Sequence, residues 1–111
     1  MISQAILQLR CQYTHDNNIT VCDINSGLCK VFADDIAAMG YGVAAWGDQF
    51  DDISYWSPDI LEKLTPDMFI DFAEVHCFIY YNNRFYDSEC PQGCIFIDHL
   101  PIYQRTRGLI L

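Results

Sequence analysis

The chain has 111 residues, of which 51% are hydrophobic and 14% aromatic. This composition suits one globular domain with a modest core and excludes a disordered chain. No apolar run approaches the ~20 residues that a membrane span needs. We therefore expect a single domain over residues 1–111 that does not associate with membranes.

The net charge of -9 is unevenly distributed. Residues 34–74 contain ten acidic side chains and one basic side chain, Lys63, whereas the rest of the chain has five of each sign. An acidic belt of this kind repels DNA and RNA, so we expect no direct nucleic-acid binding. Residues 34–74 either form a solvated surface or attract a basic protein partner, and both interpretations stay open.

The N-terminus "MISQAILQLRCQ" lacks a basic segment followed by an uninterrupted apolar stretch, so it does not resemble a signal peptide. We expect a cytoplasmic protein whose cysteines stay reduced. A structural zinc site needs four ligands, and the C-x3-C pair lacks a matched second pair, although His76, Cys77 and His99 are near in sequence. We expect no metal and no cofactor. The six cysteines are Cys11, Cys22, Cys29, Cys77, Cys90 and Cys94.

Helical periodicity dominates the first two thirds of the chain. Apolar residues at helical spacing predict an amphipathic helix over residues 2–14, ended by "HDNN". A second helix is predicted from near Ser26, capped by Asn25 or Ser26, to about Met39, with glycines after it. "GDQFDD" follows as a loop. "SPDILEKL" and "TPDMFIDF" each place a Ser-Pro or Thr-Pro pair at a helix start, so both are predicted short helices.

The pattern changes to strands from Glu74. "EVHCFIYY" and "RFYDSE" are rich in aromatic and β-branched residues and flank "NN", which suits a two-residue hairpin turn. "GCIFID" is predicted as a third strand, and "LPIYQR" as a closing helical turn or packed tail. Helices followed by an antiparallel sheet indicate an α+β domain.

The hairpin suggests a set of reactive side chains. Pairing about Asn82 and Asn83 makes facing residue numbers sum to 165, so His76 lies opposite Glu89 and diagonal to Asp87. Either carboxylate could orient the imidazole. If the helix that carries Cys29 packs on this face, a thiol, an imidazole and a carboxylate meet, as nucleophilic catalysis requires. Core filling remains the simpler interpretation of Cys29 alone.

Three segments in order carry a resemblance to a known fold: "SGLCKVFADDIAAMG", "VHCFIYYNNRFYDSECPQG" and "LPIY". They resemble the papain-like, transglutaminase-like cysteine hydrolases, and more closely small, mostly uncharacterised proteins of phage and bacteria, over residues 23–105. The resemblance implies a papain-like core, a bacterial or phage-infected cell, and Cys29 as nucleophile, His76 as base and Asp87 as orienting carboxylate. Glu89 is a secondary carboxylate candidate.

Two places depart from the pattern of the resemblance. Related sequences often carry Gly before the histidine and Trp after it, whereas Val75 and Cys77 flank His76, and the second departure lies before the cysteine. Papain-like enzymes place a glutamine before the cysteine to hold the oxyanion, and here Asp23, which cannot donate, lies near that place. Asn25 is the substitute candidate, together with the backbone N–H of Cys29.

The expected function is therefore a cysteine hydrolase that acts on an amide, isopeptide or thioester bond of a protein or peptide-like substrate. The alternative is a non-enzymatic acidic interaction protein, such as a phage-encoded inhibitor of a host protein, on the same fold.

Overall fold

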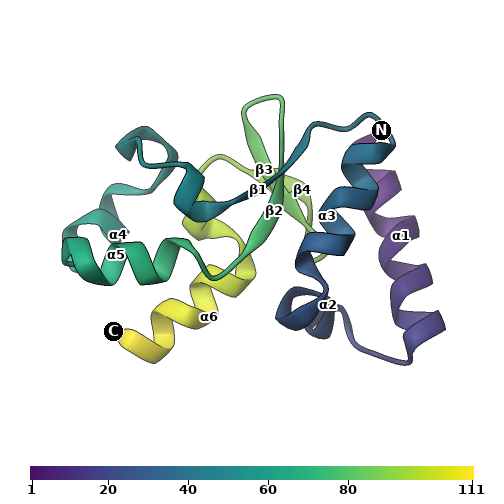
Figure 1. Ribbon diagram of the computed structural model, residues 1–111, viewed down its shortest axis with the longest axis horizontal. Helices are drawn as coiled ribbons and strands as arrows, with labels where there is room; N and C mark the ends of the chain where they lie inside the picture. The colour runs from purple at the N-terminus through teal and green to yellow at the C-terminus, as the bar shows by residue number, and fades with distance from the viewer.

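The computed structural model describes residues 1–111 as an α+β domain in which helices flank a four-stranded antiparallel sheet (Figure 1). None of its helices combines the length and the apolar character needed to traverse a lipid bilayer. The helices are α1 (Ile2–Asn17), α2 (Val21–Gly27), α3 (Cys29–Ala38), α4 (Pro58–Lys63), α5 (Pro66–Ala73) and α6 (Pro101–Ile110), and the strands are β1 (Val43–Trp46), β2 (Cys77–Tyr81), β3 (Arg84–Asp87) and β4 (Cys90–Cys94).

The sheet has the order β1-β2-β3-β4, and every neighbouring pair is antiparallel. The predicted hairpin register is confirmed, because Ile79 faces Tyr86 and Tyr80 faces Phe85. Asn82 and Asn83 have φ values of 50° and 61°. These left-handed conformations are the ones that a two-residue hairpin turn requires and that asparagine tolerates.

The strands alternate their side chains between two cores. Cys77 and Ile79 face α1, α2 and α3, whereas Phe78 and Phe85 face the layer that contains α4, α5 and α6. Figure 1 shows the sheet edge-on between these two groups of helices. Because successive strand residues point to opposite faces, a single hairpin supplies both cores.

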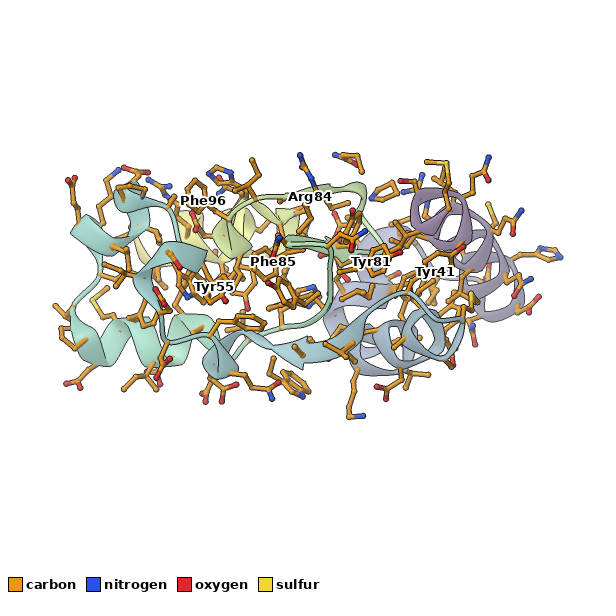
Figure 2. The ribbon with its side chains drawn as sticks, turned by 90° about the horizontal axis from the view of Figure 1, so that it is seen from above. Tyr41, Tyr55, Tyr81, Arg84, Phe85 and Phe96 are labelled. Atoms are coloured by element: carbon orange, nitrogen blue, oxygen red, sulfur yellow. The ribbon has the colours of Figure 1, made fainter.

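Aromatic side chains fill both halves, as the labelled residues in Figure 2 show. Tyr55 and Phe85 lie in the half with α4 to α6, with ring centroids 6.0 Å apart and almost perpendicular planes. Tyr41 and Tyr81 lie in the other half, 5.8 Å apart, in the same edge-to-face geometry. This arrangement is favourable for the ring quadrupoles and stabilises each half separately.

The N-terminal helices differ from the prediction at their ends. The predicted buried face of α1 is confirmed by Ile2, Ile6 and Leu9, but the helix continues to Asn17 before Asn18 adopts a left-handed conformation. The predicted second helix is divided, because α2 ends at Gly27 and Leu28 separates it from α3.

Asn25 and Ser26 therefore lie inside α2 and do not cap a helix, so that prediction is wrong. Thr20 is the cap instead. Its side chain accepts a hydrogen bond from the backbone of Asp23, whose carboxylate accepts one from the backbone of Thr20. This reciprocal capping box offsets the poor helix propensity of so short a segment.

Both predicted Ser-Pro and Thr-Pro helix starts are confirmed, in α4 and α5. Thr65 caps α5 through the backbone N–H of Met68. Ser57 precedes α4 but directs its hydroxyl and its backbone N–H to the buried carboxylate of Asp98, at 2.5 and 2.8 Å. These bonds join α4 to the turn before α6.

The remaining strands depart from the sequence analysis. Residues 43–46 received no assignment and form β1, an edge strand that enters the sheet after Gly42. The predicted third strand over residues 93–98 is displaced, because β4 runs from Cys90 to Cys94 and residues 97–99 form a 3-10 turn. The closing segment is a full helix, α6.

Gly47 marks the closest approach between β1 and the helical layer. A Cβ atom on Gly47 would lie 2.0 Å from the carbonyl oxygen of Ala73 and 2.4 Å from the hydroxyl of Tyr103. That hydroxyl donates to the same carbonyl at 2.8 Å, in a fully buried position. The packing around the His76 backbone therefore requires a residue without a side chain at position 47.

We predict that Gly47→Ala lowers the free energy of unfolding by about 2–4 kcal/mol, because the new methyl group displaces a buried hydrogen-bonded pair. Urea unfolding followed by circular dichroism measures the change. Gly108→Ala is the matched control, since its Cβ would meet nothing within 4 Å and it lies in α6. The control should gain up to about 1 kcal/mol, and equal effects of the two substitutions would contradict the prediction.

Candidate functional site

Cys29 is the first residue of α3, and it is partly exposed. Leu28 precedes it, and no side chain caps the first N–H groups of the helix. The backbone N–H groups of Cys77 and Lys30 donate to its sulfur, and both lower the pKa of the thiol. The break at Leu28 therefore places the thiol at a helix start that favours its anionic form.

His76 lies just before β2, and its side chain is fully buried. The imidazole packs beside Phe78 and Tyr103, with ring centroids 6.2 and 6.0 Å away. Its Nε2 atom is 2.9 Å from a carboxylate oxygen of Asp87. Its Nδ1 atom has no hydrogen-bond partner, so this nitrogen is the one left for the Cys29 thiol.

Asp87 ends β3 and is 2% exposed. Its second oxygen, Oδ1, accepts the backbone N–H of Glu89 at 2.9 Å. This is the side-chain-to-backbone bond with which aspartate stabilises tight turns. The Asp87 carboxylate is thus hydrogen-bonded both to His76 and to the turn between β3 and β4.

The pKa values of Cys29 and His76 move toward each other. Burial raises the pKa of the Cys29 thiol, but its interactions with the His76 side chain and with the backbone of Cys77 outweigh burial and lower it. Burial lowers the pKa of His76, but Asp87 and then Cys29 outweigh burial and raise it. The thiol and the imidazole therefore interact electrostatically, although the contact falls short of a directed hydrogen bond. Such contacts are often long before a substrate binds.

The sequence analysis made the meeting of thiol and imidazole conditional on the Cys29 helix packing on the sheet face of His76. In the structure, α3 packs against the opposite face, with Cys77 and Ile79. His76 lies just before β2, and its side chain interacts with Cys29 from that position.

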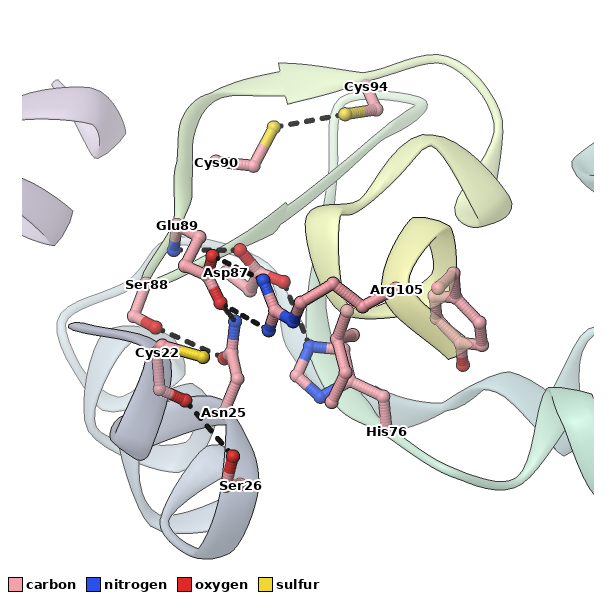
Figure 3. Close-up of polar contacts among 12 residues, drawn as sticks. Cys22, Asn25, Ser26, His76, Asp87, Ser88, Glu89, Cys90, Cys94 and Arg105 are labelled. Carbon is pink, nitrogen blue, oxygen red and sulfur yellow. Dashed lines mark hydrogen bonds and ion pairs between the residues drawn. The ribbon is translucent and has the colours of Figure 1, made fainter. Parts of the chain in front are cut away.

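Asn25 and Glu89 form a second polar cluster beside Asp87 (Figure 3). Asn25 is 3% exposed, donates its amide hydrogen to Glu89 at 2.9 Å and accepts from the Ser88 hydroxyl at 3.1 Å. Glu89 also receives two hydrogen bonds from the Arg105 guanidinium, at 2.7 and 2.8 Å. Asn25 thus joins α2 to the β3–β4 turn, and its role toward an oxyanion stays a prediction.

Of the two predicted carboxylates, Asp87 is the one that contacts the imidazole. Glu89 instead binds Arg105, which lowers the pKa of its carboxyl against the effect of burial, with a further contribution from Asn25. The sequence analysis did not predict Arg105 as a site residue. Nothing in "LPIYQR" indicates that its arginine reaches back across sixteen residues to this turn.

No group of three or more histidine, cysteine, aspartate or glutamate side chains is arranged to hold a metal ion. The predicted neighbourhood of His76, Cys77, Cys90, Cys94 and His99 therefore does not form a zinc centre in this structure. Cys77 lies on the sheet face opposite His76, and burial together with the nearby Cys29 raises its pKa to about 11.

The surface hollows of the protein do not include Cys29, His76 or Asp87. One of them, about 470 Å³, lies between η1 (Gly47–Gln49), α4 and α5, and another of about 550 Å³ is lined by residues that include Ile53, Trp56 and Phe96. A smaller one, about 280 Å³, is lined by Val75, next to His76, and by residues of α5 and α6. A substrate that reached Cys29 would meet an open surface and not a deep pocket.

Comparisons with protein family models, with curated proteins and with solved structures find no match to this chain. The geometry of the site is therefore the basis for any functional conclusion.

We predict that Cys29 reacts with iodoacetamide at a lower pH than Cys77, because their pKa values shift in opposite directions. The measurement uses a Cys11→Ser and Cys22→Ser background. Trypsin then places Cys29 in the peptide of residues 11–30 and Cys77 in that of residues 64–84. Mass spectrometry across pH follows each rate, and equal labelling of the two cysteines near pH 6 would contradict the assignment.

The same measurement tests how the site is coupled. Asp87→Asn removes the negative charge that raises the pKa of His76, so less imidazolium remains beside Cys29. His76→Gln keeps a hydrogen-bonding group next to Asp87 but has no charge. Both variants should slow Cys29 labelling several-fold at pH 6 and move its midpoint to higher pH, whereas labelling of Cys77 at high pH stays unchanged.

We predict that Arg105→Gln lowers the free energy of unfolding by about 1 kcal/mol near neutral pH. Arg105 is 43% exposed, so water screens an otherwise well-formed bidentate pair. Because the folded pKa of Glu89 lies below 4.5, the contribution is present above that pH and is lost as pH falls through the folded value.

Urea unfolding at several pH values measures this dependence. Arg107→Gln is the control, since Arg107 also lies in α6 but pairs with the exposed Asp59. We expect a smaller loss in the control. A difference between wild type and Arg105→Gln that persists unchanged in acid would contradict the role of the Glu89 carboxylate.

Proposed function

We propose that the protein is a cysteine hydrolase, a peptidase, amidase or deamidase, with a papain-like arrangement of its helix and sheet. The proposal rests on one observation: the His76 imidazole has Nε2 held by Asp87 and Nδ1 unpartnered, and it shifts the pKa of a thiol at a helix start. A thiol, a base and an orienting carboxylate in this order are the groups that nucleophilic acyl transfer uses.

In the proposed reaction, the Cys29 thiolate attacks the carbonyl carbon of an amide, isopeptide or thioester bond. The bond to the leaving nitrogen or sulfur breaks, and the His76 imidazolium gives its proton to the leaving group. His76 then takes a proton from water, which attacks the acyl group on Cys29. The C–S bond breaks and releases a carboxylic acid and the free enzyme.

The burial of the site constrains this reaction. Cys29 is partly exposed, but the side chain of His76 is not exposed at all. A substrate therefore meets the sulfur first, and proton delivery requires the groups that cover His76 to move aside. Asn25 donates to Glu89, so we assign the oxyanion to backbone N–H groups of the first turn of α3.

The open surroundings of Cys29 favour a protein or peptide-like substrate over a small molecule. Small ligands are usually enclosed by a pocket, and the three hollows of this protein are lined by other residues. An extended chain can instead be held along a surface. The hollow lined by Val75, the residue before His76, is the candidate that we propose to receive a substrate side chain.

A peptidyl thioester tests the proposed function, because it transfers its acyl group more readily than an amide. In the Cys11→Ser and Cys22→Ser background, we predict that the protein hydrolyses it, with an acyl group found transiently on the peptide of residues 11–30, where Cys29 is then the remaining thiol. Cys29→Ala should abolish both signals, and His76→Gln should slow hydrolysis by about 100-fold or more, on the order of the effect of a general base. Cys77→Ser is the matched control and should keep wild-type activity.

Two results would contradict the proposal. One is thioester hydrolysis that Cys29→Ala leaves unchanged. The other is an acyl group on Cys29 that persists equally long in wild type and in His76→Gln, because Cys29 would then be reactive without being part of a hydrolase.

The acidic interaction protein is the second candidate, and the exposure of the acidic side chains favours it. Nine of the ten acids in residues 34–74 are exposed, and only Asp34 and Asp59 of these form ion pairs. The uncompensated charge could bind a basic protein surface. Such binding should weaken with salt and should survive Cys29→Ala, which distinguishes it from hydrolysis.

A further inference from the structure

Strand β4 contains a pair of cysteines outside the candidate site. The sulfur atoms of Cys90 and Cys94 are 2.9 Å apart and share a hydrogen bond (Figure 3). Cys90 is 2% exposed, whereas Cys94 is partly exposed. The proposed hydrolase mechanism uses neither thiol, so the close pairing requires its own explanation.

An irregularity in the sheet brings the two cysteines together. Residues four apart in a regular strand are separated by ~13 Å. Here Phe85 pairs with Cys94 and Asp87 pairs with Cys90, so four steps along β4 lie opposite two steps along β3. This register shift is a β-bulge, and it shortens the path between the two cysteines. Their sulfur atoms lie 2.9 Å apart, so a disulfide requires only a small further approach.

Glycine makes this bulge possible. Gly93 has a φ of 81°, and a Cβ atom there would lie 2.6 Å from the ring of Tyr86. A side chain would be strained by the backbone conformation and would clash with the ring. The peptide between the cysteines is therefore shaped for their contact before any bond joins them.

The two thiols are chemically unequal. The contact between the two thiols lowers the pKa of Cys94 although burial opposes this, and the same contact, together with burial, raises the pKa of Cys90. Cys94 is also the more exposed of the two. Cys94 is therefore the thiol that reacts first with an oxidant, and the protonated Cys90 reacts second.

We propose that Cys90 and Cys94 form a redox-active dithiol, which low-molecular-weight disulfides oxidise to an intramolecular disulfide. The Cys94 thiolate attacks one sulfur of the oxidant, forms a mixed disulfide and releases one thiolate. The Cys90 sulfur then attacks Cys94 and displaces the second half of the oxidant, which leaves as a thiol with the Cys90 proton. Starting from one thiolate and one thiol, the cysteine pair loses two electrons and one proton, and the oxidant gains them as it becomes one thiolate and one thiol.

Metal binding explains the pair less well. Two sulfurs are half of the ligand set of a structural zinc, and no third histidine, cysteine or carboxylate is arranged to complete a site. The bulge, in contrast, already holds the two sulfur atoms 2.9 Å apart, and a disulfide needs no third ligand.

The test equilibrates the reduced protein in glutathione buffers of increasing oxidised fraction, blocks free thiols with N-ethylmaleimide and digests with trypsin. Both cysteines fall in the peptide of residues 85–105, and Cys11, Cys22 and Cys29 fall in that of residues 11–30. We expect the first peptide to become unlabelled and two hydrogens lighter in buffers that leave most of Cys11 and Cys22 free. If it stays doubly labelled while those exposed thiols are modified, the proposal is overturned.

Single substitutions test the order of attack. Cys90→Ser should accumulate a mixed disulfide with glutathione at Cys94, because no second thiol displaces it. Cys94→Ser should leave Cys90 unmodified under the same conditions, and equal modification in the two variants would overturn the assigned roles. Cys29→Ser should still form the Cys90–Cys94 disulfide, so this result is independent of the proposed hydrolase.

Discussion

The carboxylate of Asp87 is the group on which the rest of this arrangement depends. A buried charge is stable only when its oxygens are hydrogen-bonded, and each oxygen of Asp87 has its own partner: the imidazole of His76 and the backbone N–H of Glu89. The first bond orients the imidazole, and the second shapes the turn into β4. Since the same turn carries Ser88 and Glu89, the bonds to Asn25 and Arg105 also depend on where this carboxylate lies.

The site lies where two separate cores meet. The helices α1 to α3 cover one sheet face and α4 to α6 cover the other, so neither group alone encloses His76. Cys29 comes from the first group, whereas Tyr103, which packs beside the imidazole, comes from the second. Arg105 in α6 reaches Glu89, which in turn holds Asn25 in α2, and this chain of bonds crosses the end of the sheet.

Two thiols in this protein have lowered pKa values for different physical reasons. Cys29 is affected by an imidazole and by backbone N–H groups at a helix start, which together favour a nucleophile for carbonyl carbon. Cys94 is affected by a second thiol, which favours exchange between sulfur atoms. Cys77 lies near Cys29 but lacks an imidazole or thiol partner of its own. Burial and the charge of Cys29 therefore raise its pKa. The reactivity of each cysteine is thus decided by its immediate neighbours.

Local pattern determined a large part of this protein. The buried stripe of α1, the Pro-led starts of α4 and α5, and the register of the Asn82–Asn83 hairpin follow from side-chain periodicity, capping and turn chemistry, all of which act over a few residues. The hairpin register also placed His76 near Asp87. Tertiary structure alone decided the break at Leu28, the strand β1, the bulge in β4 and the choice of Asp87 over Glu89 as the partner of His76. Each of these depends on groups distant in sequence: β1 needs β2 to pair with, the bulge needs β3, and Glu89 is bound by Arg105 from a helix whose position no local pattern specifies.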